Sequence, residues 1–163
     1  MDILWSPWRM QYILDPKPDE CVFCLPSEGG GDRERLVLYR GQTAFVVLNK
    51  YPYNSGHLLI APFRHTMEYC SLTKEESSEL FILSQLCVTV LERVSSPQGF
   101  NLGFNLGGAA GAGVKGHLHM HVVPRWNGDS SFIAVLGETR TLPEHLDATF
   151  LKLKPIFDAL TSP

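Results

Sequence analysis

The sequence has no long hydrophobic run and no recognisable export signal. No stretch approaches the roughly 18 continuous apolar residues of a membrane-spanning helix. The first five residues, MDILW, lack the basic start and apolar middle of a signal peptide. We therefore expect neither a membrane protein nor a secreted one, and a cytoplasmic location follows by default.

A large excess of positive charge is also missing. Lysine and arginine number 14 against 17 aspartate and glutamate residues, which gives a formal net charge of −3. This balance offers no electrostatic footprint for long nucleic acid, so we expect no nucleic-acid partner. A small anionic ligand is not excluded, because a pocket can be locally positive on an acidic protein.

Internal repeats and domain boundaries are absent from the sequence as well. A chain of 163 residues has the usual size of one domain and can bury about two-thirds of its unfolded surface. Its hydrophobic fraction of 44% and charged fraction of 19% are ordinary for a globular protein. We expect a single domain over residues 1–163, in which residues 1–35 form an irregular segment.

Cysteines are few, and one pair has the spacing of a metal or redox motif. Cys21 and Cys24 form a C-x2-C, which is compatible with either a zinc site or a redox pair. The sequence contains no second C-x2-C, so a zinc ion would need two ligands of another kind. Cys70 and Cys87 have no partner at such a spacing, and we expect them to be ordinary buried residues.

The sequence does contain short strand-like runs around one long helical pattern. Apolar residues recur every three or four positions between Lys74 and Val94, which predicts a helix with one face on a sheet. Thr73 and Glu76 fit a capping box at its start, and a second helix is predicted over 146–160. Runs of β-branched and aromatic residues between turn residues predict five strands, namely 36–40, 43–48, 57–61, 100–106 and 117–123. Together these elements predict an α+β fold with a mainly antiparallel sheet.

Three of the six histidines alternate with apolar residues at positions 117, 119 and 121. Successive side chains of a strand point to opposite faces, so the three imidazoles would share one face. Leu118 and Met120 would then point into the core. On a helix the same spacing would spread the rings over about 200 degrees. The pattern therefore predicts a strand with a functional histidine face.

Three interpretations of this face are open. It could be a histidine-rich but merely solvated surface. It could be a catalytic metal site, although such a site needs a further carboxylate ligand and none lies between His117 and Asp129. It could support covalent catalysis by a neutral imidazole, whose second nitrogen would keep its proton on an acceptor such as a backbone carbonyl.

The run His117-Leu118-His119-Met120-His121-Val122-Val123 resembles the signature of the histidine triad (HIT) superfamily. The resemblance extends over about residues 21–143. Within it, His57 matches the family's fourth histidine and Asn49 its ribose-binding position. Segments 5–9 (WSPWR) and 126–132 resemble the bacterial branch near diadenosine tetraphosphate phosphorylases. The resemblance implies a HIT-like fold, with a five-stranded sheet, one long central helix and a C-terminal helix. It also implies a homodimer, or a larger assembly, whose sheets join.

Members of this superfamily cleave a phosphoanhydride or phosphoramidate bond of a nucleoside 5′-phosphate through a covalent nucleotidyl-histidine. On this chain the resemblance makes His119 the nucleophile, with His121 assisting at the leaving group and His57 supporting the site. It further implies nucleotide contacts from Asn49, Phe45, Asn105, Gly111, Ala112, Gly113, Val114 and His121. Lys115, Arg125 and Arg9 are additional candidates for anion contacts. The loop departs from the family's usual Ala-Gly-Gln, so a side-chain contact to phosphate is lost.

The resemblance also concerns the cysteine pair. In zinc-containing members the ligands resemble Cys21, Cys24, His65 and His117. Two thiolates and two imidazoles would form a closed, tetrahedral structural site for Zn2+. His117 would then bind metal instead of taking part in the reaction.

The implied function is cleavage of dinucleoside polyphosphates, such as diadenosine tetraphosphate, at the α-phosphate by hydrolysis or phosphorolysis. The partner would be a small nucleotide. A nucleoside phosphoramidate hydrolase is the alternative enzyme, and a nucleotide-binding sensor without turnover is the alternative from another class. An intact His119 favours turnover. His121 disfavours the uridylyltransferase-like relatives, which carry glutamine at this position.

Overall fold

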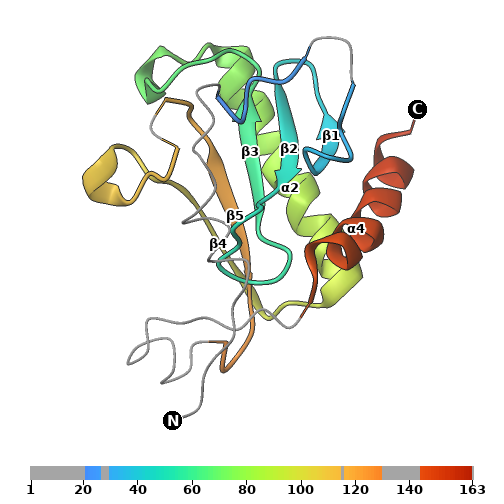
Figure 1. Ribbon diagram of the computed structural model, residues 1–163. Coiled ribbons are helices and arrows are strands. Elements are labelled where there is room, and N and C mark those ends of the chain that lie inside the picture. The colour runs from blue at the N-terminus through green and yellow to red at the C-terminus, as the bar shows by residue number, and fades with distance from the viewer. Residues whose placement is uncertain (1–20, 27–29, 115, 130–143, 163) are drawn as a thin grey trace.

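A computed structural model describes residues 21–26, 30–114, 116–129 and 144–162. It contains a five-stranded antiparallel sheet with two helices packed on one face (Figure 1). This confirms the predicted α+β fold. The elements are β1 (Val37–Arg40), β2 (Ala44–Leu48), β3 (Leu58–Pro62), η1 (Tyr69–Ser71), α2 (Lys74–Ser95), β4 (Gly99–Phe104), η2 (Gly108–Ala110), β5 (Met120–Arg125) and α4 (Leu146–Thr161).

The strands are arranged in the order β1-β2-β3-β5-β4, and every neighbouring pair is antiparallel. β5 therefore lies inside the sheet, between β3 and β4. His121 on β5 is in register with Leu59 on one side and with Gly103 on the other. The last histidine of the run is thus held between two strands.

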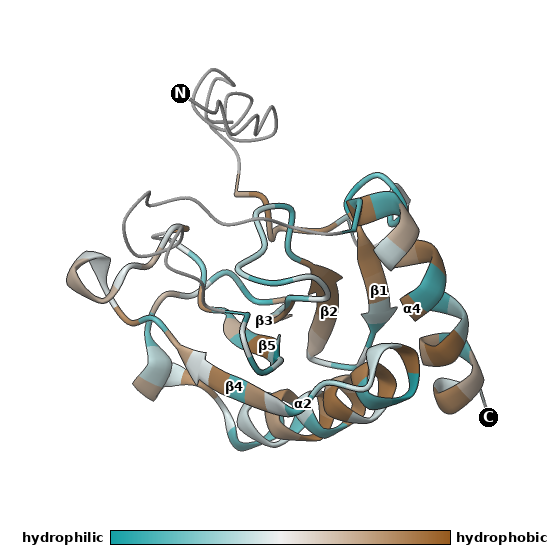
Figure 2. Ribbon diagram, turned by 90° about the horizontal axis from the view of Figure 1, so that it is seen from below, coloured by the Kyte–Doolittle hydropathy of each residue, from teal (hydrophilic) through white to brown (hydrophobic). Residues whose placement is uncertain are grey.

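The two faces of the sheet have different neighbours. Ala44, Val46 and Leu48 of β2 belong to the main core, which α2 and α4 complete. Phe45 and Val47 alternate with them and belong to a smaller apolar cluster on the opposite face. Figure 2 shows α2 running along one side of the sheet while the other side lies away from the helices. The second face is therefore the one available for a site.

α2 begins as predicted. The Thr73 side chain accepts from the Glu76 N–H, and the Glu76 carboxylate accepts from the Thr73 N–H, which is the expected capping box. The predicted apolar stripe is buried at Leu80, Leu83 and Cys87.

Among the described residues, no helix is long and apolar enough to cross a membrane.

The predicted bounds of the fifth strand were wrong. Instead of covering 117–123, β5 begins at Met120 and continues through Pro124 to Arg125. Pro124 is tolerated because its backbone faces the β3 side beyond the last β3 pair, at Val122. There the Asn54 side chain donates to the Pro124 carbonyl at 3.0 Å. The missing proline N–H therefore interrupts no ladder.

One of the two lone cysteines was also wrongly placed. Cys87 is fully buried on α2, as expected. Cys70 is exposed, because it lies in the short η1 turn, which contributes no residue to the core.

Candidate functional site

Three histidine rings gather on the sheet face opposite α2. His57 precedes β3, His121 lies on β5, and His119 lies just before β5. The His121 ring centroid is 5.1 Å from that of His57 and 5.0 Å from that of His119. All three side chains are buried. The structure thus brings together the three residues that the resemblance makes catalytic.

Hydrogen bonds determine which nitrogen carries the proton in two of these rings. The Tyr53 N–H donates to His57 Nδ1 at 3.0 Å, so a neutral His57 carries its proton on Nε2. That Nε2 lies 2.9 Å from His121 Nδ1 and donates to it. The proton of neutral His121 is therefore on Nε2, 3.3 Å from the Asn105 amide. An amide can present its oxygen to such an N–H after a flip.

His119 has the opposite tautomer. Its Nδ1 lies 2.8 Å from the His117 carbonyl oxygen and donates to it. This is the carbonyl acceptor that covalent catalysis requires. The Nε2 of His119 then has a lone pair available for attack.

The environments of His119 and His121 favour the neutral form of both rings. Burial, and to a smaller extent the nearby His119, lower the pKa of His121 to about 4. Burial also lowers the pKa of His119, although the hydrogen bond to the His117 carbonyl acts in the opposite direction. An imidazole with a lone pair on Nε2 therefore stands beside one with an N–H on Nε2.

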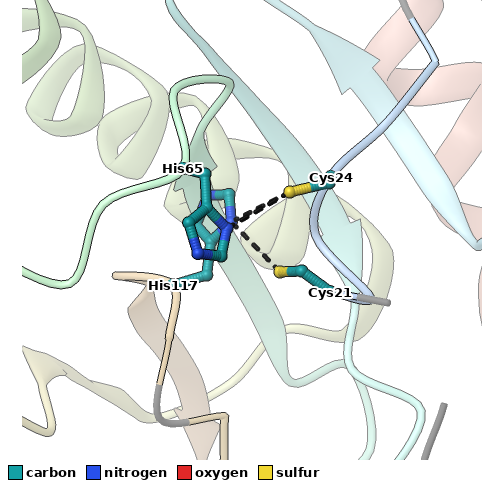
Figure 3. Close-up of side chains that lie close together, drawn as sticks. All are labelled: Cys21, Cys24, His65 and His117. Carbon is teal, nitrogen blue, oxygen red and sulfur yellow. Dashed lines mark hydrogen bonds between the residues drawn. The ribbon is translucent and has the colours of Figure 1, made fainter. Parts of the chain in front are cut away.

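A second cluster lies on the other side of His119, where Cys21, Cys24, His65 and His117 converge (Figure 3). Their four potential ligand atoms all lie within 4.8 Å of one another. His117 Nδ1 is 3.3 Å from Cys21 Sγ, and His65 Nδ1 is 3.3 Å from Cys24 Sγ. His117 Nε2 donates to the Pro62 carbonyl at 2.8 Å, which leaves the Nδ1 lone pair facing the thiols. This cluster could hold a metal ion.

Two aromatic residues that the sequence reasoning did not select also belong to the site. Phe23, inside the C-x2-C motif, lies with its ring centroid 5.0 Å from that of His119. Tyr53 stacks on His121 with an interplanar angle of 13° and also contacts His57 at 4.6 Å. The available signals were the position of Phe23 between the cysteines and the turn residues around Tyr53.

The residues expected to contact the nucleoside lie at different depths. Asn49 accepts from the Tyr51 N–H through Oδ1, and its Nδ2 lies 3.2 Å from His57 Nδ1. Phe45 is fully buried and stacks on Phe63, with 5.3 Å between the ring centroids. Asn49 thus lies at the edge of the histidine cluster, whereas Phe45 belongs to the apolar cluster that contains Phe23.

The small-residue loop forms a turn of its own, which projects away from the sheet in Figure 1 (amber). The Gly111 N–H donates to the Gly108 carbonyl, and the Ala112 N–H to the Gly107 carbonyl. Two of the four expected phosphate donors are therefore used inside the turn. The N–H groups of Gly113 and Val114 donate to no backbone carbonyl of the described residues. Val114 packs against the apolar cluster that contains Phe23.

Of the three basic residues expected as candidates for anion contacts, the structure describes one. Arg125 is paired with Asp129 through two bonds, from Nε to Oδ2 at 2.6 Å and from Nη2 to Oδ1 at 2.7 Å. Its guanidinium is therefore already engaged with a carboxylate. Lys115 and Arg9 lie outside the described residues.

Buried, neighbouring imidazoles on a five-stranded sheet of this order are features of a histidine triad protein. The HIT domain family model matches residues 31–128, and the chain belongs to this family. It is 42% identical over 154 residues to the AP-4-A phosphorylase of Mycobacterium tuberculosis, covering 90% of this chain and 79% of that protein. It is also 26% identical over 132 residues to the bis(5′-adenosyl)-triphosphatase of Dictyostelium discoideum, covering 77% of this chain and 88% of the relative.

A solved structure resembles the chain as well. It is a Zn-bound histidine triad family protein from Mycobacterium smegmatis, with a TM-score of 0.63 and 27% identity. The match covers 78% of this chain and 86% of that protein.

Proposed function

We propose that the protein cleaves dinucleoside polyphosphates, such as diadenosine tetraphosphate, at the α-phosphate through a nucleotidyl-histidine on His119. The observation that carries the proposal is the pair of opposite tautomers: a lone pair on His119 Nε2 and a proton on His121 Nε2. The names of the relatives in Mycobacterium tuberculosis and Dictyostelium discoideum support the substrate class.

The reaction takes place in two displacements. His119 Nε2 attacks the α-phosphorus, a P–N bond forms, and the P–O bond to the remaining phosphates breaks. His121 Nε2–H donates a hydrogen bond to the departing oxygen, which leaves as a nucleotide anion. Water or inorganic phosphate then attacks the same phosphorus, the P–N bond breaks, and the electron pair returns to Nε2. When water is the acceptor, the proton that it loses passes to the solvent.

His57 and Asn105 act through His121. The Tyr53 N–H holds the His57 proton on Nε2, and this proton keeps His121 in the donor tautomer. Asn105 lies beside the donor, where its amide can contact a phosphate oxygen. Asn49, 3.2 Å from His57, would contact the ribose.

The amides of Gly113 and Val114 would bind the α-phosphate oxygens, because the turn does not use them. The side chain that the family usually places in this loop is absent. Backbone groups therefore supply the phosphate contact there.

The site favours a phosphoanhydride over a phosphoramidate. A departing polyphosphate is already an anion and needs a hydrogen bond, whereas a departing amine needs a proton. Burial holds the pKa of His121 near 4, so in the free protein this residue is a poor source of that proton. A sensor function without turnover would not require the tautomer that leaves His119 ready to attack.

We also propose that Cys21, Cys24, His65 and His117 bind a structural Zn2+. The donor set is two thiols and two imidazoles with no carboxylate, which suits zinc and leaves no open position for catalysis. The Zn-bound relative supports this assignment. A bound ion would hold the segment around Phe23 against His119 and contribute to folding.

We also propose that the protein forms a homodimer or a larger assembly. β4 is an edge strand, and its Leu102 side chain is 44% exposed, as are apolar residues of α2 such as Phe81 (57%) and Ile82 (60%). Such surfaces are typical of interaction sites. Light scattering on the purified protein should give at least twice the mass of one chain, and a monomer would contradict this part.

The activity is tested by incubating the protein with diadenosine tetraphosphate, with and without inorganic phosphate. ADP and ATP would indicate phosphorolysis, whereas AMP and ATP would indicate hydrolysis. Absence of cleavage under both conditions would overturn the proposal.

A further inference from the structure

A cavity of about 350 Å3 extends from the histidine cluster along β4 and β5. His121 and Asn105 line one end, and Arg125 and Asp129 line the other. His121 and Arg125 are four positions apart on β5, which corresponds to about 13 Å along a strand. The cavity is therefore long enough for more than a phosphate group.

One residue that lines the cavity, Gly103, has no side chain. Gly103 of β4 lies in register with His121, and a Cβ built on it would meet nothing within 4 Å. Its φ angle is not in the left-handed region, so the backbone does not require glycine there. The absence of a side chain leaves space in the cavity.

The charges that line the cavity cancel each other. Arg125 forms its two bonds with Asp129, and its Nη1 donates to Asn101 Oδ1 at 2.7 Å. The remaining lining is neutral and includes amides and the Tyr53 ring, which keeps 39% of its surface exposed. A carboxylate in the wall disfavours a free phosphate, whereas amides and an aromatic ring suit a nucleoside.

The position of the cavity also indicates which of the two nucleosides of the substrate it would receive. The transferred half is assigned to the side of Asn49, which follows β2, whereas β4 lies on the other side of β5 in the sheet. The cavity begins at His121, the residue that donates to the leaving oxygen. The leaving nucleotide therefore starts at the mouth of the cavity.

We propose that this cavity binds the nucleoside of the leaving nucleotide, the half of the dinucleoside polyphosphate that is not transferred to His119. The inference rests on the proposed function. It makes the β4–β5 cavity the reason why a dinucleoside polyphosphate is preferred over a mononucleoside polyphosphate with the same scissile bond.

The test compares kcat/KM for diadenosine tetraphosphate and adenosine 5′-tetraphosphate in the wild type and in Gly103→Val. The wild type should prefer the dinucleoside by about 10-fold or more, which corresponds to roughly 1.4 kcal/mol. Gly103→Val should abolish the preference, because kcat/KM should fall much further for the dinucleoside than for the mononucleoside substrate. Gly99→Val is the matched control, because Gly99 is on the same strand, has equally open space at its Cβ and does not line the cavity. It should keep the preference.

Asn101→Ala provides a second, milder variant on an exposed side chain, and it should reduce the preference several-fold. Asn101→Ala tests the proposed nucleoside site if Gly103→Val unfolds below the assay temperature. A full preference in both variants would overturn the inference. So would an increased KM for inorganic phosphate with an unchanged preference, since the cavity would then bind the acceptor. Cleavage of neither substrate by the wild type would instead overturn the proposed function.

Discussion

The two clusters beside His119 each contain one histidine of the same five-residue run, yet they are held in different ways. The His57–His121 pair is linked by hydrogen bonds within the chain, which start from a backbone N–H. The Cys21–His117 cluster directs four ligand atoms at one another. The comparison teaches that the first cluster is complete as it stands, whereas the second has the arrangement of a site that a metal ion completes.

His119 lies between the two clusters and should show the largest effect. We expect His119→Ala to lower kcat by about 10^4-fold or more, because no other described group presents a lone pair at this position. Radiolabelled AMP should remain on the wild-type chain after alkaline denaturation and be absent from the variant. His145→Asn, at the exposed start of α4, is the control and should react like the wild type. A labelled His119→Ala chain would place the nucleophile elsewhere.

The metal cluster should show the next largest effect. Cys24→Ser should reduce the zinc content from about one per chain to background and lower activity by roughly 10- to 100-fold, because His117 also anchors His119 through its carbonyl. Elemental analysis and a thermal melt measure the change. Cys70→Ser, at an exposed cysteine outside the cluster, should alter neither. Unchanged zinc content in Cys24→Ser would rule out the proposed ligand set.

The hydrogen-bonded cluster should respond without loss of metal. His57→Phe removes the donor that holds the His121 tautomer, and kcat should fall by about 100-fold. Zinc content should stay the same, which separates this effect from that of the cysteines. His57→Gln, whose amide can donate at the same place, should recover part of the rate. Equal rates for the two variants would mean that His57 has a packing role instead.

The smallest effect concerns pH. Burial lowers the pKa of His121 to about 4, and the rings that face it are His57, His119 and Tyr53. The pKa of His119 is lowered as well. A lowered pKa keeps the neutral form as pH falls, so kcat/KM should stay level through pH 6.5 and decline only toward pH 4 to 5. An acid limb centred near 6.5 would contradict this assignment.

Much of the fold could be predicted because local signals agreed with it. The capping box at Thr73, the apolar stripe of α2 and the turn-bounded strands all correspond to observed elements. The start of β5 could not be predicted, because alternation from His117 onward resembles strand periodicity even where no ladder forms. The end of β5 could not be predicted either, because a proline such as Pro124 has no N–H for a ladder and usually ends a strand. Its tolerance depends on a side chain 70 residues away, Asn54.

The site shows the same division. The alternation at 117, 119 and 121 correctly indicated neighbouring imidazoles, and the resemblance indicated which cysteines and histidines meet. The two tautomers could not be predicted, because they depend on the Tyr53 N–H and the His117 carbonyl. Nor could the cavity, since it results from a glycine on one strand facing a histidine on another. These features arise from register, which no single segment contains.

Pro124 has a mechanical consequence. β3 pairs with β5 over Met120 to Val122, and beyond that point β5 pairs with β4 alone. His121 is thus held in a three-stranded part of the sheet, whereas Val123 to Arg125 belong to a two-stranded ribbon that the Asn54–Pro124 bond ties to the segment before β3. The ribbon carries the far end of the cavity. The reacting groups and the far end of the cavity are therefore anchored by different contacts: strand pairing on both sides at His121, and side-chain bonds from Asn54 beyond it.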